Sequence, residues 1–170
     1  MSNKNTAANI NGRMFRDVMG LFATGVTVVT ADLEGETHGM TANAITSLSL
    51  DPLLVLVCVQ KDAMMAGILQ QAGAFAISIL SADQEHLSNF FAGIWPEGAD
   101  PPFFSFEPWV GGGRLHGVIG ALACKIDKFL DGGDHWIITG LVVDLYRQEA
   151  PVDPLIYYTG RYHRLSRGGA

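Results

Sequence analysis

The sequence predicts a mainly β fold, a closed or nearly closed antiparallel barrel with a few covering helices. Three observations indicate it. Short apolar and β-branched runs recur along the chain, turn residues separate them at short intervals, and the last third contains a run of strand-like segments. The 170 residues are interpreted as one domain, because no internal repeat and no linker divides them.

The chain is expected to start with a disordered lead-in over residues 1–12, followed by a domain over residues 13–166. A short helix opens that domain and ends at Gly25. Apolar residues at helical spacing form its inner face, namely Phe15, Val18, Met19 and Phe22.

Strands follow this helix. The β-branched and apolar patterns predict strands over residues 26–30, 36–42, 47–50 and 53–59, with a turn at 32–35. The strand over 53–59 is apolar throughout, as expected where both faces are buried.

Two helices and a long loop occupy the middle of the chain. The first helix is expected over 61–71, with an inner face of Met64, Met65, Ile68 and Leu69. A strand over 74–80 follows it. Ser81 and Gln84 form a capping-box pattern that opens the second helix. Its expected inner face is Leu87, Phe90 and Phe91, and residues 93–113 are expected to form a loop.

The C-terminal third predicts two antiparallel hairpins. Strands over 120–130 and 135–146 flank Asp131-Gly132-Gly133-Asp134, which is a strong turn signal. A second pair is expected over 155–158 and 162–165.

Charge and hydropathy exclude several classes of partner. The net charge is −6 and no Lys/Arg cluster runs along the chain, which argues against nucleic-acid binding and against a polybasic membrane surface. The longest apolar run, residues 53–59, is far too short to span a membrane, and residues 1–10 lack an apolar signal core. Cys58 and Cys124 form no metal-like or CxxC pattern, so free thiols in a reducing cytoplasm are expected.

The balance of apolar and charged residues favours an oligomer. Apolar residues make up 48% of the chain and charged residues only 16%, against about 25% charged in ordinary soluble domains. Part of the apolar surface is therefore expected in an obligate subunit interface. The alternative is a core that is simply rich in Gly and Ala.

Several enzyme classes lack their motifs in this sequence. It has no GxGxxG after a strand, no GxxxxGK[ST] and no GxSxG, so Rossmann, P-loop and α/β-hydrolase chemistry are unsupported. The five histidines are dispersed, and no metal site is expected. No pair of carboxylates stands out for acid–base catalysis.

The segment over residues 40–52 has the composition of a nucleotide site. It is dense in small hydroxyl and amide residues, which leave backbone N–H groups unobstructed and add hydroxyl donors. A flavin ring with polar edges and a phosphate needs such donors. The alternative is an ordinary β-turn region in which these side chains satisfy the backbone.

Four motifs occur in a characteristic order: residues 24–30 (TGVTVVT), the 41–52 block from TAN to DP, 132–135 (GGDH) and 158–162 (YTGRY). In these motifs the chain resembles the short-chain flavin reductase family over roughly residues 13–165. That family includes the reductase components of two-component monooxygenases such as the phenol and 4-hydroxyphenylacetate hydroxylases.

The resemblance implies an FMN-binding split barrel that forms a homodimer, with the flavin at the subunit interface. Carried over by position, the residues expected at the isoalloxazine edge are Thr41, Ala42, Asn43 and Ala44. Those expected near the ribityl chain and phosphate are Thr46, Ser47 and Leu48. The phosphate side would be held by Cys58, Val59, Gln60 and Lys61, with Lys61 as the countercharge.

The resemblance also assigns His135 to the nicotinamide side of the flavin. Arg161 is a candidate for the nicotinamide phosphates or for closing the dimer site. Phe91 is a candidate cover for the flavin, and Tyr158 is a further candidate contact. Each has a plain structural alternative: a surface histidine beside a hairpin, an arginine in a surface turn, and aromatic residues in the core.

The implied activity is hydride transfer from NADH or NADPH to FMN or FAD, with reduced flavin passed to a partner monooxygenase. Such chemistry belongs to the cofactors and requires no strong general base. Two alternatives stay open: a flavoprotein that retains FMN and reduces another acceptor, such as a corrinoid or a ferric chelate, and a non-catalytic flavin-binding module.

Overall fold

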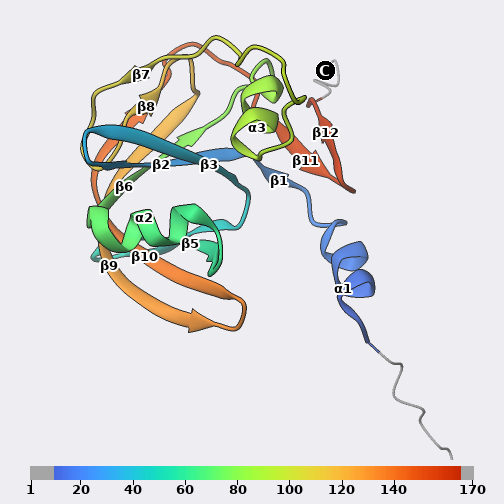
Figure 1. Cartoon of the computed structure of the whole chain (residues 1–170), viewed down its shortest axis with the longest axis horizontal. Helices are drawn as coiled ribbons and strands as arrows, with labels where there is room; N and C mark the ends of the chain where they lie inside the picture. Colours follow the sequence, from blue (N-terminus) through green and yellow to red (C-terminus); the bar gives the residue numbers. More distant parts are fainter. Residues whose placement is uncertain (1–9, 166–170) are drawn as a thin grey trace, which may run out of the picture.

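The structure is a computed structural model that describes residues 10–165 (Figure 1). Residues 1–9 of the predicted lead-in lie outside the described residues. At the end of that lead-in, Asn11 is the N-cap of the first helix and Gly12 is its first residue. No helix in the described part of the chain is long and apolar enough to cross a membrane.

Seven antiparallel strands form the main sheet. They are β2 (Thr27–Leu33), β3 (Glu36–Ala42), β4 (Ile45–Leu50), β5 (Leu53–Gln60), β6 (Ala74–Ile79), β9 (Gly120–Gly132) and β10 (His135–Arg147). Their order is β3-β2-β6-β9-β10-β5-β4. Within residues 10–165 no ladder joins the two outer strands, β3 and β4, so the barrel is split between them. The predicted mainly β antiparallel fold is confirmed.

The interior of the barrel is filled by alternate residues of its strands. On β5, Val55, Val57 and Val59 point inward and are almost fully buried. Strand β2 is buried on both faces, because Val29 joins this interior while Val28 joins a second apolar cluster outside the sheet. Its continuous β-branched run matches that position between two cores.

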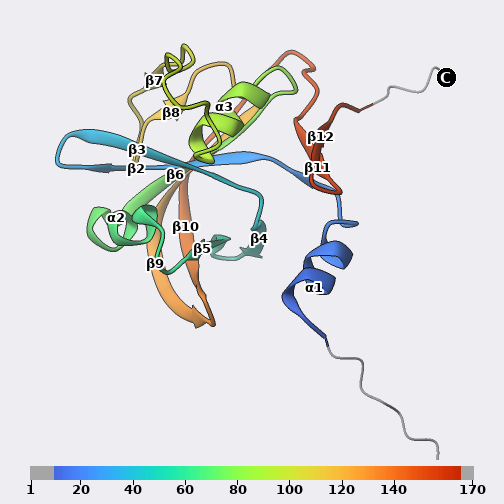
Figure 2. The same ribbon diagram turned by 45° about the vertical axis from the view of Figure 1, so that its right-hand side comes forward.

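Three helices accompany the sheet: α1 (Gly12–Met19), α2 (Met64–Ala72) and α3 (Glu85–Phe91). Helix α2 lies in the gap between the β2–β3 and β9–β10 hairpins and closes the interior (Figure 1). Helix α3 packs on the outer side of β2 and β3. Helix α1 stands away from the barrel (Figure 2), and none of its residues is buried.

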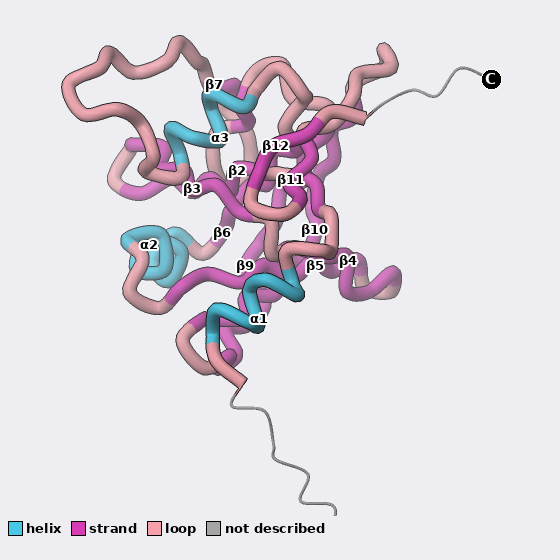
Figure 3. The backbone as a smooth tube through the Cα atoms, turned by 90° about the vertical axis from the view of Figure 1, so that its right-hand side faces the viewer, coloured by secondary structure: helices cyan, strands magenta, loops and turns pink. Residues whose placement is uncertain are grey.

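Two small sheets complete the fold. One consists of β1 (Thr24–Gly25), β11 (Ile156–Tyr158) and β12 (Arg161–His163). The other pairs β7 (Phe106–Glu107) with β8 (Arg114–Leu115). Strand β7 lies inside the segment predicted to be a loop, and β8 directly follows that segment. Viewed from the side, α1, the β11–β12 hairpin and the β4–β5 end of the main sheet gather on one face (Figure 3).

Three details of the predicted helices are wrong. Helix α1 ends at Met19 with Gly20 as its C-cap, not at Gly25, because residues 24–25 pair with β11. Helix α2 begins at Met64 and not at residue 61. Met64 is 73% exposed, and Ala66 lies on the inner face in its place.

The third detail concerns α3. Gln84, not Ser81, is the N-cap residue of that helix. The Gln84 side chain instead accepts a hydrogen bond from the backbone N–H of Ser81 at 3.0 Å. The pair found in the sequence is therefore used in the turn that leads into the helix.

The packing of Gly140 on β10 gives a stability prediction. A Cβ at Gly140 would lie 2.6 Å from the Phe75 ring and 2.9 Å from Cys124 Cβ, both in the buried interior. We expect Gly140→Ala to lower the free energy of unfolding by about 1–3 kcal/mol in urea denaturation, because overpacking strains the core. Gly67→Ala is the matched control. It lies in α2 with open space around it, and is expected to raise stability by about 1 kcal/mol. Equal effects of the two substitutions would contradict this packing.

Candidate active site

A cleft of about 850 Å³ opens on the face where α1, β4–β5 and the β11–β12 turn meet. Helix α1 and the residues after it supply Phe15, Arg16, Asp17, Met19, Gly20, Phe22 and Thr24. The β3–β4 connection, the start of β4 and the strand β5 supply Asn43, Ala44, Ile45, Thr46, Leu56 and Cys58. The β11–β12 hairpin supplies Tyr157, Thr159 and Gly160. The volume lies in the range of small-molecule and cofactor sites.

Strand β5 is the wall between this cleft and the core. Leu56 and Cys58 line the cleft, whereas the neighbouring Val57 and Val59 point into the interior. The Cys58 backbone N–H donates to the Ala44 carbonyl oxygen at 2.9 Å, which holds the residues before β4 against this wall. Partial burial raises the pKa of the Cys58 thiol, so its side chain is an apolar, un-ionised part of the wall.

Main-chain contacts attach α1 to the far side of the cleft. The Thr159 N–H donates to the Gly20 carbonyl oxygen at 2.8 Å. Strand β1 then pairs with β11, with Thr24 opposite Tyr157. The Asn43 side-chain amide donates to Thr24 Oγ1 at 3.2 Å, so the β3–β4 connection joins the same assembly.

The predicted segment 41–48 divides between two roles. Asn43, Ala44 and Thr46 line the cleft. Thr41 instead donates to the Ser88 carbonyl oxygen at 2.6 Å and ties β3 to α3, while Ala42 is buried and accepts from Thr27 Oγ1 at 2.6 Å. Two further predicted residues, Ser47 and Leu48, are exposed on β4 outside the cleft lining.

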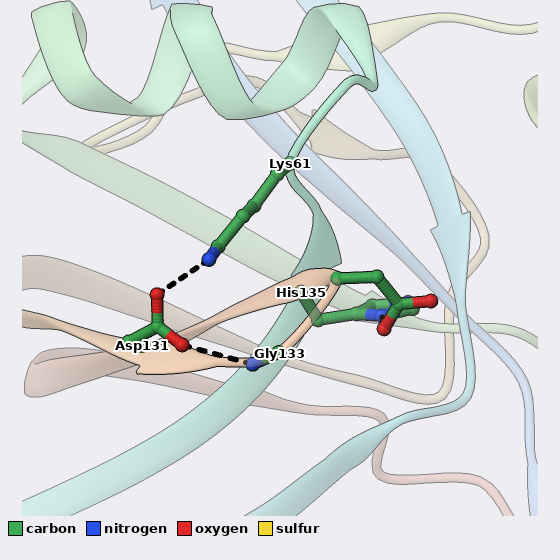
Figure 4. Close-up of polar contacts among 5 residues, drawn as sticks. Lys61, Asp131, Gly133 and His135 are labelled. Atoms are coloured by element: carbon green, nitrogen blue, oxygen red, sulfur yellow. Dashed lines mark hydrogen bonds and ion pairs between the residues drawn. The ribbon is translucent and has the colours of Figure 1, made fainter.

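The end of β5 meets the turn between β9 and β10 (Figure 4). Lys61 Nζ lies 2.5 Å from Asp131 Oδ2, so the predicted phosphate countercharge is paired with a carboxylate of this chain. His135 lies opposite Gln60 in the β5–β10 register, and its Nδ1 is 2.7 Å from Asp134 Oδ1.

Both carboxylates of the turn are more acidic than usual. The Lys61 ammonium and the Gly133 N–H hold the pKa of Asp131 below its ordinary value. The contact with His135 lowers the pKa of Asp134. Both side chains are ionised at neutral pH.

The remaining predicted residues lie outside the cleft lining. Val59 is buried, so only its main chain is available to a ligand. Phe91 lies in an aromatic cluster, 5.1 Å from Phe104 between ring centroids, and a Cβ on Gly39 would be 2.7 Å from its ring. Phe91 is thus partly buried and packs against the second apolar cluster, in the kind of position that the sequence left as its alternative.

The β11–β12 hairpin carries the last two predicted residues. Tyr158 stacks edge-to-face on His163 at 5.8 Å between ring centroids. Arg161 is exposed directly after the cleft-lining Gly160. Neither residue lines the cleft itself.

Sequence reasoning missed twelve of the sixteen residues that line the cleft. Helix α1 was predicted, but its role in lining a site was not, and Tyr157, Thr159 and Thr24 were not selected. Besides the 41–52 block, two of the four motif segments, 24–30 and 158–162, also contain cleft-lining residues, and that was the available signal. A contact between segments more than 130 residues apart along the chain has no local pattern.

The cleft suits a flavin nucleotide chemically. Its floor of Ile45, Leu56 and Cys58 is apolar, as a flat aromatic ring system requires, and Asn43 and Thr46 offer polar groups at its edge. Arg16 is a cation in the lining that could face a phosphate, a role that Lys61 does not have while it is paired with Asp131.

Fold and cleft together define a split-barrel protein with a site of cofactor size. Residues 19–166 match the flavin reductase like domain. The chain is 42% identical over 153 residues to the NADH-dependent flavin reductase of a Rhodococcus species, covering 88% of this chain and 84% of that protein. It is 41% identical over 152 residues to the reductase component of 4-hydroxyphenylacetate 3-monooxygenase of Thermus thermophilus, covering 89% and 95%.

A solved structure agrees with this match. Flavin reductase PheA2 in its native state superposes with a TM-score of 0.87 at 40% identity, covering 93% of this chain and all of that one. The chain belongs to the flavin reductase-like family.

The Lys61–Asp131 pair predicts a pH dependence of stability. The folded-state pKa of Asp131 lies below its ordinary value of 3.8, so the pair stabilises the fold above that pH and its contribution disappears as the pH falls through the folded-state pKa. Wild type is therefore expected to exceed Asp131→Asn in urea stability at about pH 6, and the difference is expected to shrink below about pH 4. In a Lys61→Met background the difference is expected to be smaller, because only the contribution of the Gly133 N–H remains. A difference that is constant with pH would contradict the pair.

Proposed function

We propose that this protein is an NADH:flavin oxidoreductase that reduces FMN or FAD and supplies reduced flavin to a partner monooxygenase. The observation that carries the proposal is the cleft at the rim of the split barrel, where Asn43, Ala44, Thr46 and Cys58 of the expected flavin set meet. We propose NADH rather than NADPH as the electron donor, because the Rhodococcus relative is an NADH-dependent enzyme.

The residues of this chain have binding and positioning roles in the proposed reaction. A bound flavin supplies hydride acceptance from a reduced nicotinamide, which needs no acid–base pair of the protein. Asn43 and Thr46 would hold its polar edge, and Leu56 and Cys58 would contact its apolar face. His135 and Arg161 are proposed to face the nicotinamide nucleotide.

We further propose that the active form is a homodimer. Phe15, Val18 and Phe22 at the edge of the cleft are 62%, 66% and 71% exposed, an apolar stripe that a monomer would leave in water. Exposed Leu48, Leu50 and Leu53 around the β4–β5 turn extend this apolar surface. A second copy that covers both would also exclude water from the cleft.

Two further expectations accompany the proposal. Residues 13–166 are taken as the functional unit. The two cysteines are free, Cys124 buried and Cys58 partly so, which supports a reducing cytoplasm as the compartment.

The proposed reaction is tested by NADH oxidation at 340 nm with and without added FMN or FAD. Rapid oxidation that depends on added flavin is expected. Thr46→Val should raise the flavin KM roughly 2- to 12-fold, the equivalent of one lost hydrogen bond. The control is Thr37→Val, which removes a hydrogen bond to Asp32 near the β2–β3 turn and should leave the flavin KM unchanged.

The other outcomes identify the alternatives. Flavin that stays bound through purification and is reduced without added flavin would favour an enzyme with another electron acceptor. Flavin binding without oxidation of NADH or NADPH would contradict the reductase and leave a binding module.

The homodimer is tested by sedimentation equilibrium at micromolar concentration. Wild type is expected to be a dimer, and the double variant Phe15→Asp, Phe22→Asp a monomer with weakened flavin binding, because two charges enter an apolar interface. Phe103→Asp is the matched control. Phe103 is 92% exposed on the loop after α3, away from the cleft, and its variant should stay dimeric. A monomeric wild type, or a dimeric double variant, would contradict the proposal.

A further inference from the structure

The turn between β9 and β10 is held by contacts from both sides. Within the turn, Asp131 Oδ1 accepts the Gly133 N–H at 3.0 Å. From outside, Lys61 Nζ pairs with Asp131 Oδ2 at 2.5 Å, and the Lys61 backbone N–H donates to the Asp134 carbonyl oxygen at 3.0 Å. One residue of the β5–α2 connection thus contacts both ends of the turn. Figure 4 shows its contact with Asp131.

An aromatic ring completes this attachment. Lys61 Nζ lies 4.8 Å from the centroid of the Trp136 ring, a cation–π distance. Trp136 follows His135 on β10 and points to the other face of the strand, where it packs on Phe129 and the barrel interior. Lys61 therefore connects the turn to the packed core.

The fixed turn presents a carboxylate to His135. Asp134 Oδ1 lies 2.7 Å from His135 Nδ1. An ionised carboxylate can only accept a hydrogen bond, so Nδ1 must carry the proton in this contact. In the neutral ring the other nitrogen, Nε2, is then left unprotonated.

The position of His135 makes this tautomer relevant to the cleft. His135 lies opposite Gln60, and the next pair on the same faces of these strands is Ile137 with Cys58. Cys58 lines the cleft, so the imidazole lies one pair of residues beyond the cleft wall.

We propose that Asp134 is a positioning residue that fixes the Nδ1–H tautomer of His135, and that Lys61 and Asp131 hold the turn which presents it. Lys61 then holds the β9–β10 turn in place on the nicotinamide side and is not the countercharge of the flavin phosphate. The kinetic part of this inference rests on the proposed reductase function, whereas the tautomer does not.

The tautomer is measured directly by long-range ¹H–¹⁵N NMR of protein labelled in its five histidines, with His135→Gln to assign the signal. The wild-type signal of His135 is expected to show protonated Nδ1. Asp134→Ala should shift it toward the Nε2–H form. Asp62→Ala removes a nearby exposed carboxylate that has no hydrogen bond or ion pair within residues 10–165, and should leave the signal unchanged. A wild-type tautomer that persists in Asp134→Ala would overturn the proposal.

Steady-state kinetics separate positioning from loss of fold. Asp134→Ala is expected to lower kcat/KM for NADH roughly 10-fold and to leave the flavin KM unchanged. This is the lower end of the loss seen when a metal-binding histidine loses the hydrogen-bond partner of its other ring nitrogen. Lys61→Met should act in the same direction. A rise in the flavin KM alone in Lys61→Met would overturn the proposal that Lys61 holds the turn, and would indicate that it binds the flavin phosphate. A wild type that oxidises no NADH would contradict the reductase function, while the NMR result would still decide on the Asp134–His135 pair.

Discussion

The alternation of side chains along β5 sets both the core and the cleft. Val55, Val57 and Val59 fill the barrel interior, so Leu56 and Cys58 must face outward into the cleft. A shift of one residue in the pairing of β5 with β10 would exchange these faces and remove both core and cleft. The same register sets His135 opposite Gln60. The pairing of β5 with β10 therefore specifies both the packing of the core and the geometry of the site.

The side of the cleft opposite β5 is assembled by elements that contribute little to the core. Helix α1 buries none of its residues, and it is attached through the Thr159–Gly20 hydrogen bond and the β1–β11 pairing. Its apolar stripe next to an open cleft is what an obligate partner surface requires. The proposed dimer would use the same elements for subunit association and for cofactor binding, and it would shield the proposed reaction from water.

Local patterns predicted most of the fold. The hairpin over 120–146 was predicted closely because its Asp-Gly-Gly-Asp turn and its β-branched flanks agree. Met64 was misplaced because helical spacing alone does not show that the helix begins there. The pairing of Lys61 with Asp131 was not predicted, since nothing in the sequence brings Asp131 to it from 70 residues away. Tyr157 and Thr159 were missed for the same reason: the tertiary fold, not local spacing, brings them to the cleft.

Flavin is proposed to bind in the cleft between α1, β4–β5 and the β11–β12 turn. Hydrogen–deuterium exchange followed by mass spectrometry, with and without saturating FMN, locates the bound flavin along the chain. Slowed exchange is expected in peptides covering residues 15–24, 43–46 and 157–160, with little change in the loop over 93–105. Protection confined to that loop, or none in the three cleft segments while flavin is bound, would show that flavin binds elsewhere.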